Sequence, residues 1–283
     1  MRLLSIQSFV AYGHVGNSAA AFPLQRLGHE VWPVPTVVFS NHTGYGAWRG
    51  PLLAPDDVRA VVAGIEERGV LASCDAVLSG YLGGPGICEV VVDAVARVKA
   101  ANPEATYTCD PVMGNATSGC FVDPAIPPIL REQVVPHADV ITPNQFELGF
   151  LTGTEPDSLE STLESADAAR AMGPSTVLVT SVLRPGRPED TIEMVAVTAG
   201  GAWSVRTPRL PIKANGSGDL TAALFTAHLR TTGSPGEALG LTASSVVGVL
   251  QATIGSGERE LQIVLGQDAI ASPANEFVVE QVR

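Results

Sequence analysis

The chain has 283 residues, of which 45% are hydrophobic, and it carries a formal net charge of −12 at pH 7. This acidic balance, without any cluster of lysine and arginine, argues against a nucleic-acid partner. We identify no apolar stretch long enough to cross a membrane, and Gln7 and Ser8 interrupt the N-terminal apolar segment, which argues against a signal peptide. The four cysteines form no CxxC pair, so we expect reduced thiols in a cytoplasmic protein rather than a zinc site.

The predicted elements alternate between short apolar strands and helices. Strands are expected at residues 3–10, 30–39, 75–80, 105–112, 138–144 and 175–181, followed by a hairpin of 191–199 and 201–208. Helices are expected at residues 13–27, 55–69, 85–102, 146–153, 163–173, 217–230 and 235–255. Prolines within 30–39 favour an edge or irregular strand. The alternation predicts one α/β domain over residues 1–283, with a central, mostly parallel sheet between helices.

Polar residues follow several of the predicted strands. In open α/β sheets, ligands bind beyond the carboxyl ends of the strands. We therefore expect one shared crevice that includes Ser8, Ser79, Asp110, Thr142 and Thr180.

The stretch NGSGD, residues 215–219, stands just before a predicted helix. A glycine-rich turn at a helix N-terminus leaves backbone N–H groups free, and the helix dipole adds partial positive charge, so the turn can bind an anion. Asp219 falls in the first turn of this helix. The alternative is an ordinary glycine turn with an acidic residue that suits the helix dipole.

Two acidic residues stand near neighbouring strand ends. Asp110 lies in CDPVMG, and Glu147 lies in TPNQFE, three residues after Asn144. Two carboxylates at such positions suit a hydrated Mg²⁺ ion, which keeps several waters and takes few protein ligands. For Glu147 the alternative is a capping contact with the backbone near Asn144.

The segment FSNHTGYGAWRG, residues 39–50, is unusually rich in aromatic and polar side chains for a connector. It holds His42, Thr43, Tyr45 and Trp48, while Tyr81 follows another strand in SGYLGG. Binding groups often gather on loops of a rigid scaffold, and such rings could stack on a flat aromatic substrate. The alternative is a plain surface loop.

Two nucleotide-binding motifs are missing from the sequence. The chain has only two lysines, Lys99 and Lys213, and no GxxxxGK[ST] segment, which excludes a simple P-loop. The segment YGHVGN after the first strand does not provide GxGxxG, which disfavours a dinucleotide oxidoreductase.

Several of these segments together resemble the pyridoxal kinases of the ribokinase superfamily. The segments that carry the resemblance are SIQSFVAYGHVGNSAAAFPLQRLG, VVFSNHTGYGAWRG, DAVLSGYLG, CDPVMG, ITPNQFE, NGSGD and RELQIVLGQDAI. The resemblance covers almost the whole chain. It implies a ribokinase-like fold, usually in a homodimer, and ATP-dependent phosphorylation of the 5′-hydroxymethyl group of pyridoxal with Mg²⁺. A monovalent cation such as K⁺ is a further candidate cofactor.

The resemblance also implies roles for individual residues. Asp219 matches the general base, and Gly216, Ser217 and Gly218 match the anion hole, with Ser217 standing where relatives often have threonine, valine or alanine. The substrate pocket is matched by Ser8, His42, Thr43, Gly44 and Tyr81, together with Asp219. The ATP site is matched by Asp110, Asn115, Thr142, Glu147, Thr180, Ser181, Thr207, Pro208, Arg209 and Leu210, of which Asp110 and Glu147 would also hold the metal through water. The connector that contains residues 207–210 is shorter than in some relatives, so its contacts with the nucleotide base stay open.

Two other functions remain compatible with the sequence. A hydroxymethylpyrimidine kinase of the same superfamily would also accept a flat hydroxymethyl heterocycle. A protein that binds pyridoxal or its phosphate without catalysis is the alternative from a different class, although intact Asp219, Asp110 and Glu147 argue against it. The sequence does not rank pyridoxal, pyridoxine and pyridoxamine.

Overall fold

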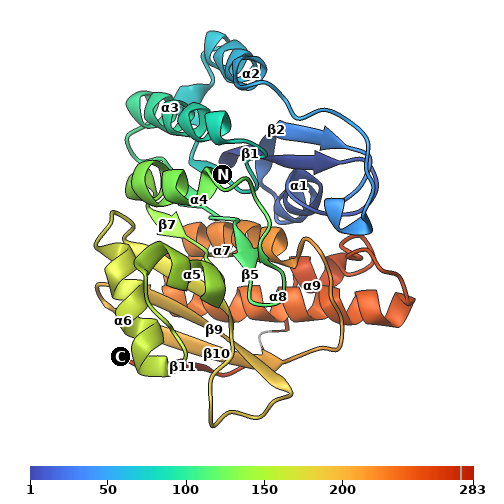
Figure 1. Cartoon of the computed structure of the whole chain (residues 1–283), viewed down its shortest axis with the longest axis vertical. Helices are drawn as coiled ribbons and strands as arrows, with labels where there is room; N and C mark the ends of the chain where they lie inside the picture. The colour runs from blue at the N-terminus through green and yellow to red at the C-terminus, as the bar shows by residue number, and fades with distance from the viewer. Residues whose placement is uncertain (275) are drawn as a thin grey trace.

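Nine strands form one sheet in the computed structural model, which describes residues 1–274 and 276–283. Their order across the sheet is β11-β10-β9-β8-β7-β4-β3-β1-β2 (Figure 1). The strands are β1 (Arg2–Val10), β2 (Glu30–Phe39), β3 (Ala76–Ser79), β4 (Thr106–Cys109), β7 (Val140–Ile141), β8 (Thr176–Val182), β9 (Thr191–Thr198), β10 (Gly201–Pro208) and β11 (Val279–Gln281). A separate small hairpin consists of β5 (Gly114–Asn115) and β6 (Gly119–Cys120).

The pairing of the strands divides the sheet into two parts. All pairs from β2 to β8 are parallel, whereas β8, β9, β10 and β11 pair antiparallel. The predicted mostly parallel sheet is thus confirmed. β2 lies at the edge of the sheet, as its prolines Pro33 and Pro35 predict, because proline cannot donate a hydrogen bond to a second neighbouring strand.

Helices cover both faces of the sheet. The helices are α1 (Asn17–Arg26), α2 (Pro55–Glu67), α3 (Pro85–Ala101), α4 (Ile126–Ile129), α5 (Gln145–Thr152), α6 (Leu159–Arg170), α7 (Ser217–Thr232), α8 (Pro235–Ser256) and α9 (Gln267–Ala271). On one face α1, α7, α8 and α9 pack together, and α7 and α8 lie side by side in Figure 1. On the other face α2, α3, α4 and α6 cover the largest hydrophobic core, which includes Val58, Val91, Ile126 and Ala166.

Several predicted boundaries were wrong. The first helix begins at Asn17 rather than at residue 13, because Gly13 and Gly16 adopt positive φ angles of 89° and 53°. The sixth helix begins four residues earlier than predicted, at Leu159, where Ser158 and Ser161 form a capping box. Short elements that the hydrophobic pattern did not indicate are α4, α9, β5, β6 and β11.

One helix also differs from the expectation that no apolar segment is long enough to cross a membrane. Helix α8 is long enough and apolar enough to do so by length and composition alone. It is instead a core helix, because 61% of its apolar window is buried inside the protein. It packs against α7, β9 and β10, which explains why its sequence is apolar on most sides.

Candidate active site

The carboxyl ends of the parallel strands are fastened to one another where the sequence predicts a crevice. The backbone N–H of Asp110 donates to the carbonyl of Ser79 at 2.9 Å, and that of Thr142 donates to the carbonyl of Cys109 at 3.1 Å. The next link runs from the N–H of Thr180 to the carbonyl of Pro143 at 2.9 Å. The ends of β3, β4, β7 and β8 therefore form one continuous edge, which places the predicted polar residues along it.

Helix α7 begins at this edge with the glycine turn of NGSGD. Gly216 caps the helix with φ 88° and ψ −6°, a left-handed conformation that favours glycine. A Cβ atom at this position would overlap the carbonyl oxygen of His14, so the turn packs directly on the segment after β1. The first intrahelical bond runs from the N–H of Leu220 to the carbonyl of Gly216. The N–H groups of residues 217–219 therefore have no partner within the helix and can bind an anion.

Asp219 lies half-buried in the first turn of α7. Burial raises the pKa of its carboxyl group to about 6, while the backbone N–H groups of Gly16 and of Asp219 itself oppose the rise. Gly16 in turn packs against Ser8, because a Cβ atom on Gly16 would overlap the Ser8 hydroxyl and carbonyl oxygens. Ser8 and Asp219, which are 211 positions apart in the sequence, thus both lie against Gly16.

Asp110 and Glu147 are both buried beside Asp219. Burial raises the pKa of the Asp110 carboxyl well above its usual range, and the charges of Glu147 and Asp219 raise it further. Burial also raises the pKa of Glu147 to about 7, although hydrogen bonds from backbone N–H groups lower it. These effects of charge require the three carboxyl groups to lie close to one another in the fold.

Glu147 also has the capping role that the sequence left open. Its Oε2 accepts from the N–H of Asn144 at 2.9 Å, and the Asn144 side chain accepts from the N–H of Glu147 at 3.0 Å. Its Oε1 accepts from the N–H groups of Met113 at 2.9 Å and Gly114 at 3.3 Å. Glu147 thus joins the turn at residues 113–114 to the start of α5. The capping contact therefore does not exclude a second role near the phosphates.

The three carboxyl groups could hold a hydrated divalent cation. None of Asp110, Glu147 and Asp219 forms an ion pair within residues 1–274 and 276–283. In the same part of the chain, no group of three or more His, Cys, Asp and Glu side chains is arranged to enclose a metal ion directly. The pKa values of all three carboxyl groups are raised, and among the described residues no cationic side chain neutralises them. Such a site suits an ion like Mg²⁺, which keeps several waters and binds only one or two carboxylates directly.

The aromatic loop reaches the same end of the sheet. Residues Thr43–Tyr45 form a short 3₁₀ turn that His42 caps, with its Nδ1 accepting from the N–H of Gly44 at 2.9 Å. A Cβ atom on Gly44 would lie 3.6 Å from the Asn215 side chain, which brings this loop against the NGSGD turn. Tyr81 packs with Val10 and Phe39 at the ends of β1 and β2. The predicted substrate residues thus come from the end of β1, the aromatic loop, the loop after β3 and the first turn of α7.

The predicted nucleotide positions fall into two groups. Thr142 is buried, and Thr180 and Ser181 follow on β8, where Ser181 has φ 55°, the only positive φ of a non-glycine residue among those that the structure describes. Asn115 has a local role, because its Oδ1 accepts from the N–H groups of Thr117 and Ser118. The second group, Thr207, Pro208, Arg209 and Leu210, lies at the end of β10 beside β9. Arg209 lines a cavity of about 370 Å³ together with residues 182–189, Thr191 and Glu193.

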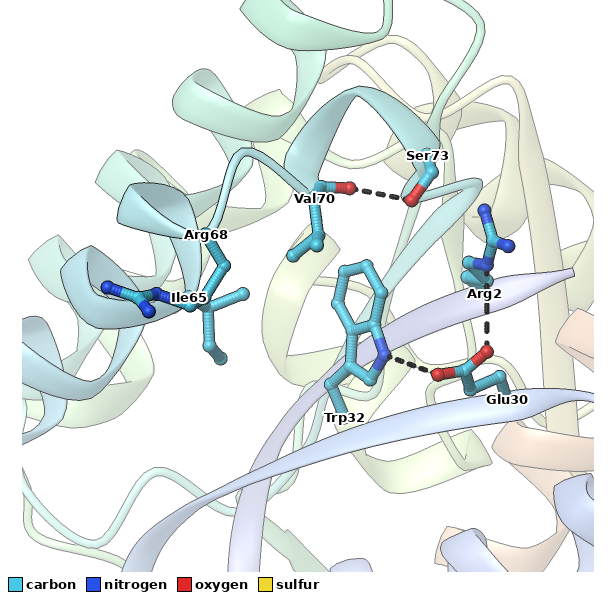
Figure 2. A pocket seen from close by; sticks show the side chains of 7 residues that line it. All are labelled: Arg2, Glu30, Trp32, Ile65, Arg68, Val70 and Ser73. Atoms are coloured by element: carbon cyan, nitrogen blue, oxygen red, sulfur yellow. Dashed lines mark hydrogen bonds and ion pairs between the residues drawn. The ribbon is translucent and has the colours of Figure 1, made fainter.

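A larger hollow of about 480 Å³ lies away from this site (Figure 2). Figure 2 shows Trp32 at its centre, with Glu30 accepting from the Trp32 indole N–H at 3.3 Å and pairing with Arg2 at 3.6 Å. Arg2 and Glu30 are the first residues of β1 and β2, so the hollow opens at the amino ends of the strands. It is therefore separate from the predicted crevice at the carboxyl ends.

Sequence reasoning missed several residues that shape the site. Gly13, Gly16 and His14 form the turn after β1, and Glu260 contacts that turn from the connection that follows α8. The positive φ of a glycine leaves no unique mark in the sequence, and the partner of Glu260 is distant in the chain. The segments SIQSFVAYGHVGNSAAAFPLQRLG and RELQIVLGQDAI of the family resemblance include these residues, but the resemblance gave them no role.

Comparisons with known proteins agree with the geometry. A family model described as Phosphomethylpyrimidine kinase matches residues 57–263. The chain is 70% identical to pyridoxal kinase PdxY of Leifsonia xyli subsp. xyli and 60% identical to pyridoxal kinase PdxY of Corynebacterium diphtheriae, each over 282 residues that cover 100% of both chains. The chain belongs to the pyridoxal kinase family. This membership confirms the resemblance inferred from the sequence segments.

The structure of this pyridoxal kinase family member agrees with a solved relative. The pyridoxal kinase from Leishmania donovani in complex with ADP and pyridoxamine superposes with a TM-score of 0.93 at 28% identity, covering 100% of this chain and 99% of that chain. The likeness confirms the expected ribokinase-like architecture, in which a central sheet lies between helices.

Proposed function

We propose that this chain, acting as one domain over residues 1–283, transfers the γ-phosphoryl group of ATP to the 5′-hydroxymethyl group of pyridoxal. The observation that carries the proposal is the position of Asp219. Its carboxyl group lies at the free N–H groups of α7, next to Gly16 and Ser8, and within the electrostatic reach of Asp110. A base, an anion site and acidic groups in one place are what phosphoryl transfer to an alcohol requires.

Asp219 is the proposed general base. A carboxyl group with a pKa of about 6 is deprotonated at neutral pH, yet it is basic enough to accept the proton of the hydroxymethyl group as the oxygen attacks phosphorus. The N–H groups of Gly216, Ser217 and Gly218, the anion hole that the resemblance implies, would then face the charge that develops on the transferring phosphoryl group. The Ser217 side chain donates to the carbonyl of Ala214 at 3.1 Å, so it also holds the turn in shape.

The nucleotide would be held by the strand ends beyond Asp110. We assign Thr142, Thr180 and Ser181 to the ATP phosphates and ribose, and Asn115 to the shape of the neighbouring hairpin. Residues 207–210 lie near the cavity that Arg209 lines, which makes the nucleotide base the ligand that would reach them. Asp110 and Glu147 would hold Mg²⁺ through water, and when bound the ion neutralises phosphate charge.

The substrate ring would lie between Tyr81 and the 42–44 loop. Ser8 and Thr43 provide hydroxyl groups for the polar edge of the pyridine ring, and His42 and Gly44 shape the loop beside Asn215. Burial lowers the pKa of His42, which favours the neutral form of its imidazole. A neutral ring suits a pocket that accepts an uncharged heterocycle.

The assembly and location follow as further proposals. We assign a homodimer in the cytoplasm, because the family resemblance implies a dimer and three of the four cysteines are buried free thiols. A monovalent cation such as K⁺ is proposed as an additional activator. Light scattering on the purified protein tests the homodimer, and a K⁺ titration of activity tests the monovalent cation.

A hydroxymethylpyrimidine kinase is the second candidate function, since the family model that matches residues 57–263 carries the description Phosphomethylpyrimidine kinase. A coupled ADP-release assay with pyridoxal, pyridoxine, pyridoxamine and hydroxymethylpyrimidine decides between the two. We expect the highest kcat/KM with a B6 vitamer. A higher value with the pyrimidine would replace the proposed substrate, and binding of pyridoxal without ADP release at any Mg²⁺ concentration would favour a binding protein.

A further inference from the structure

Glu260 is a buried carboxylate in the connection between α8 and α9, about 40 residues after the NGSGD motif. Its side chain is not part of the acidic group at Asp110. The residues that follow it anchor the connection, because Leu261 and Ile263 are buried against Leu220 and Leu224 of α7. Glu260 is therefore fixed to the same helix that carries Asp219.

Each oxygen of Glu260 contacts a different loop of the active site. Its Oε1 accepts from the hydroxyl group of Tyr45 at 2.6 Å, and its Oε2 accepts from the backbone N–H of His14 at 3.2 Å. The carboxyl group also fills the space above Gly13, where a Cβ atom would overlap Oε2. One side chain thus joins the turn after β1 to the aromatic loop.

Arg259 strengthens the link to the aromatic loop. Its guanidinium group lies 3.8 Å from the centre of the Tyr45 ring, and its Nη2 donates to the carbonyl of Gly44 at 3.0 Å. In Figure 1 the blue loop after β2 lies beside the orange-to-red connection between α8 and α9. Two neighbouring residues therefore hold the backbone and the ring of the same short turn.

These contacts close a ring of packed groups around the proposed reaction centre. Glu260 holds His14, whose carbonyl oxygen packs against Gly216 at the start of α7. Glu260 also holds Tyr45, while the adjacent Gly44 faces the side chain of Asn215. Glu260 therefore contacts both segments that pack against the NGSGD turn.

We propose that Glu260 is a positioning residue that sets the vitamer-binding loop at its working distance from Asp219. The inference rests on the proposed pyridoxal kinase activity. Glu260 does not touch the reacting atoms; it acts through Tyr45 and His14. Hydrogen bonds to a charged acceptor are stronger than neutral ones, and a rigid loop lowers the cost of ordering it on substrate binding.

The test compares Glu260→Gln and Tyr45→Phe with the parental enzyme. Gln can accept from the His14 N–H through its oxygen, but it then turns its NH₂ group towards Tyr45, which reverses that hydrogen bond and removes the charged acceptor. Tyr45→Phe removes only the hydroxyl contact and leaves the ring beneath Arg259. We expect the KM for pyridoxal to rise about ten-fold in each variant, which corresponds to about 1.4 kcal/mol. The KM for ATP should change less than about two-fold on the same scale.

Tyr12→Phe is the matched control. Its ring lies 6.2 Å from that of Tyr45, it is exposed, and its hydroxyl group forms no hydrogen bond with the residues that the structure describes. We expect parental kinetics from this variant. In the double variant Glu260→Gln/Tyr45→Phe, the KM for pyridoxal should rise by less than the product of the two single-variant increases, because both substitutions disrupt the same contact.

The outcomes separate a positioning role from a structural one. An unchanged KM for pyridoxal in both single variants would overturn the inference, as would a parallel rise in the KM for ATP. If Glu260→Gln fails to fold, the Tyr45→Phe result alone decides, since that change removes one surface-side hydroxyl. A parental enzyme without pyridoxal-dependent ADP release would instead refute the proposed function and not the contact network.

Discussion

Gly216 packs directly on the carbonyl oxygen of His14, so the first turn of α7 and the turn after β1 form one surface. The contact requires two properties of residue 216, namely a positive φ angle and the absence of a side chain. Glycine alone meets both requirements without strain, which gives the first glycine of NGSGD a structural reason that is separate from phosphate binding.

Gly216→Ala should therefore lower stability as well as activity. A left-handed conformation costs a non-glycine residue about 1–2 kcal/mol, and the clash with His14 adds to that cost. We expect a drop of more than about 2 kcal/mol in the free energy of unfolding, measured by urea denaturation. Gly64→Ala in α2 is the control, because a Cβ atom there meets no atom within 4 Å and alanine favours the helix. Equal stability of the two variants would contradict the packing argument.

Asp219→Asn should remove the general base while preserving the shape of the side chain. The expected loss in kcat is about 10²–10⁴-fold, with ATP binding retained. In the parental enzyme, kcat/KM should fall as the pH decreases below about 6, because the base becomes protonated. Because the carboxyl groups of Asp110, Glu147 and Asp219 interact, the midpoint of this pH profile reflects all three groups and not Asp219 alone. A kcat/KM that stays constant between about pH 5 and pH 8 would exclude this assignment of the base.

The order of helices and strands could be predicted from the sequence because the apolar pattern is strong. Even the edge position of β2 followed from Pro33 and Pro35. The start of α1 could not be predicted, because the positive φ angles of Gly13 and Gly16 depend on contacts with Glu260 and Ser8. The short strand β11 could not be predicted either, since its pairing with β10 joins segments far apart in the chain.

The candidate site was predictable where chemistry follows a strand end. Asp110, Glu147 and Asp219 stand next to recognisable turns, and their mutual effect on pKa appears only once the fold brings them together. The roles of Glu260 and Arg259 were not predictable from spacing. Both residues contact the aromatic loop, which lies more than 200 positions earlier in the chain.

The same Asp219→Asn variant should gain stability at neutral pH. Since the folded-state pKa of about 6 is raised, the folded protein binds this proton more tightly than the unfolded chain does. The charged carboxylate therefore costs stability above pH 6, and that cost disappears as the pH falls below the unfolded pKa of about 4. Without ligands, we expect the Tm of the variant at pH 8 to exceed the parental Tm by about 2–4 °C.

The pH dependence provides the control for that measurement. At about pH 4 the two proteins should melt at nearly the same temperature, because Asp219 is then protonated in the parental enzyme. Asp190→Asn, at an exposed loop residue, should not reproduce the difference. A lower Tm for Asp219→Asn at pH 8 would show that hydrogen bonds to the carboxylate outweigh its burial.

Asp110→Asn should raise the Mg²⁺ concentration needed for half-maximal activity. Asp110 is buried, and the charges of Glu147 and Asp219 act on it, so a neutral residue at this position weakens the combined attraction of the carboxyl groups for a cation. Glu147→Gln should do the same, with an added loss of stability because Glu147 holds three backbone N–H groups. The measurement is a Mg²⁺ titration of ADP release at saturating ATP. Unchanged titrations for both variants would count against a metal site at these carboxyl groups.

Ser181→Gly should separate stability from nucleotide binding. Ser181 has φ 55° at a register shift between Val179 and Val182, and strain of this kind is often retained at functional positions. Glycine removes the strain of about 1–2 kcal/mol but adds freedom to the unfolded chain, so stability should rise by less than about 1 kcal/mol. The KM for ATP should rise, because the hydroxyl group assigned to the nucleotide is lost. A stabilised variant with an unchanged KM for ATP would mean that the strained backbone, and not the Ser181 side chain, serves the site.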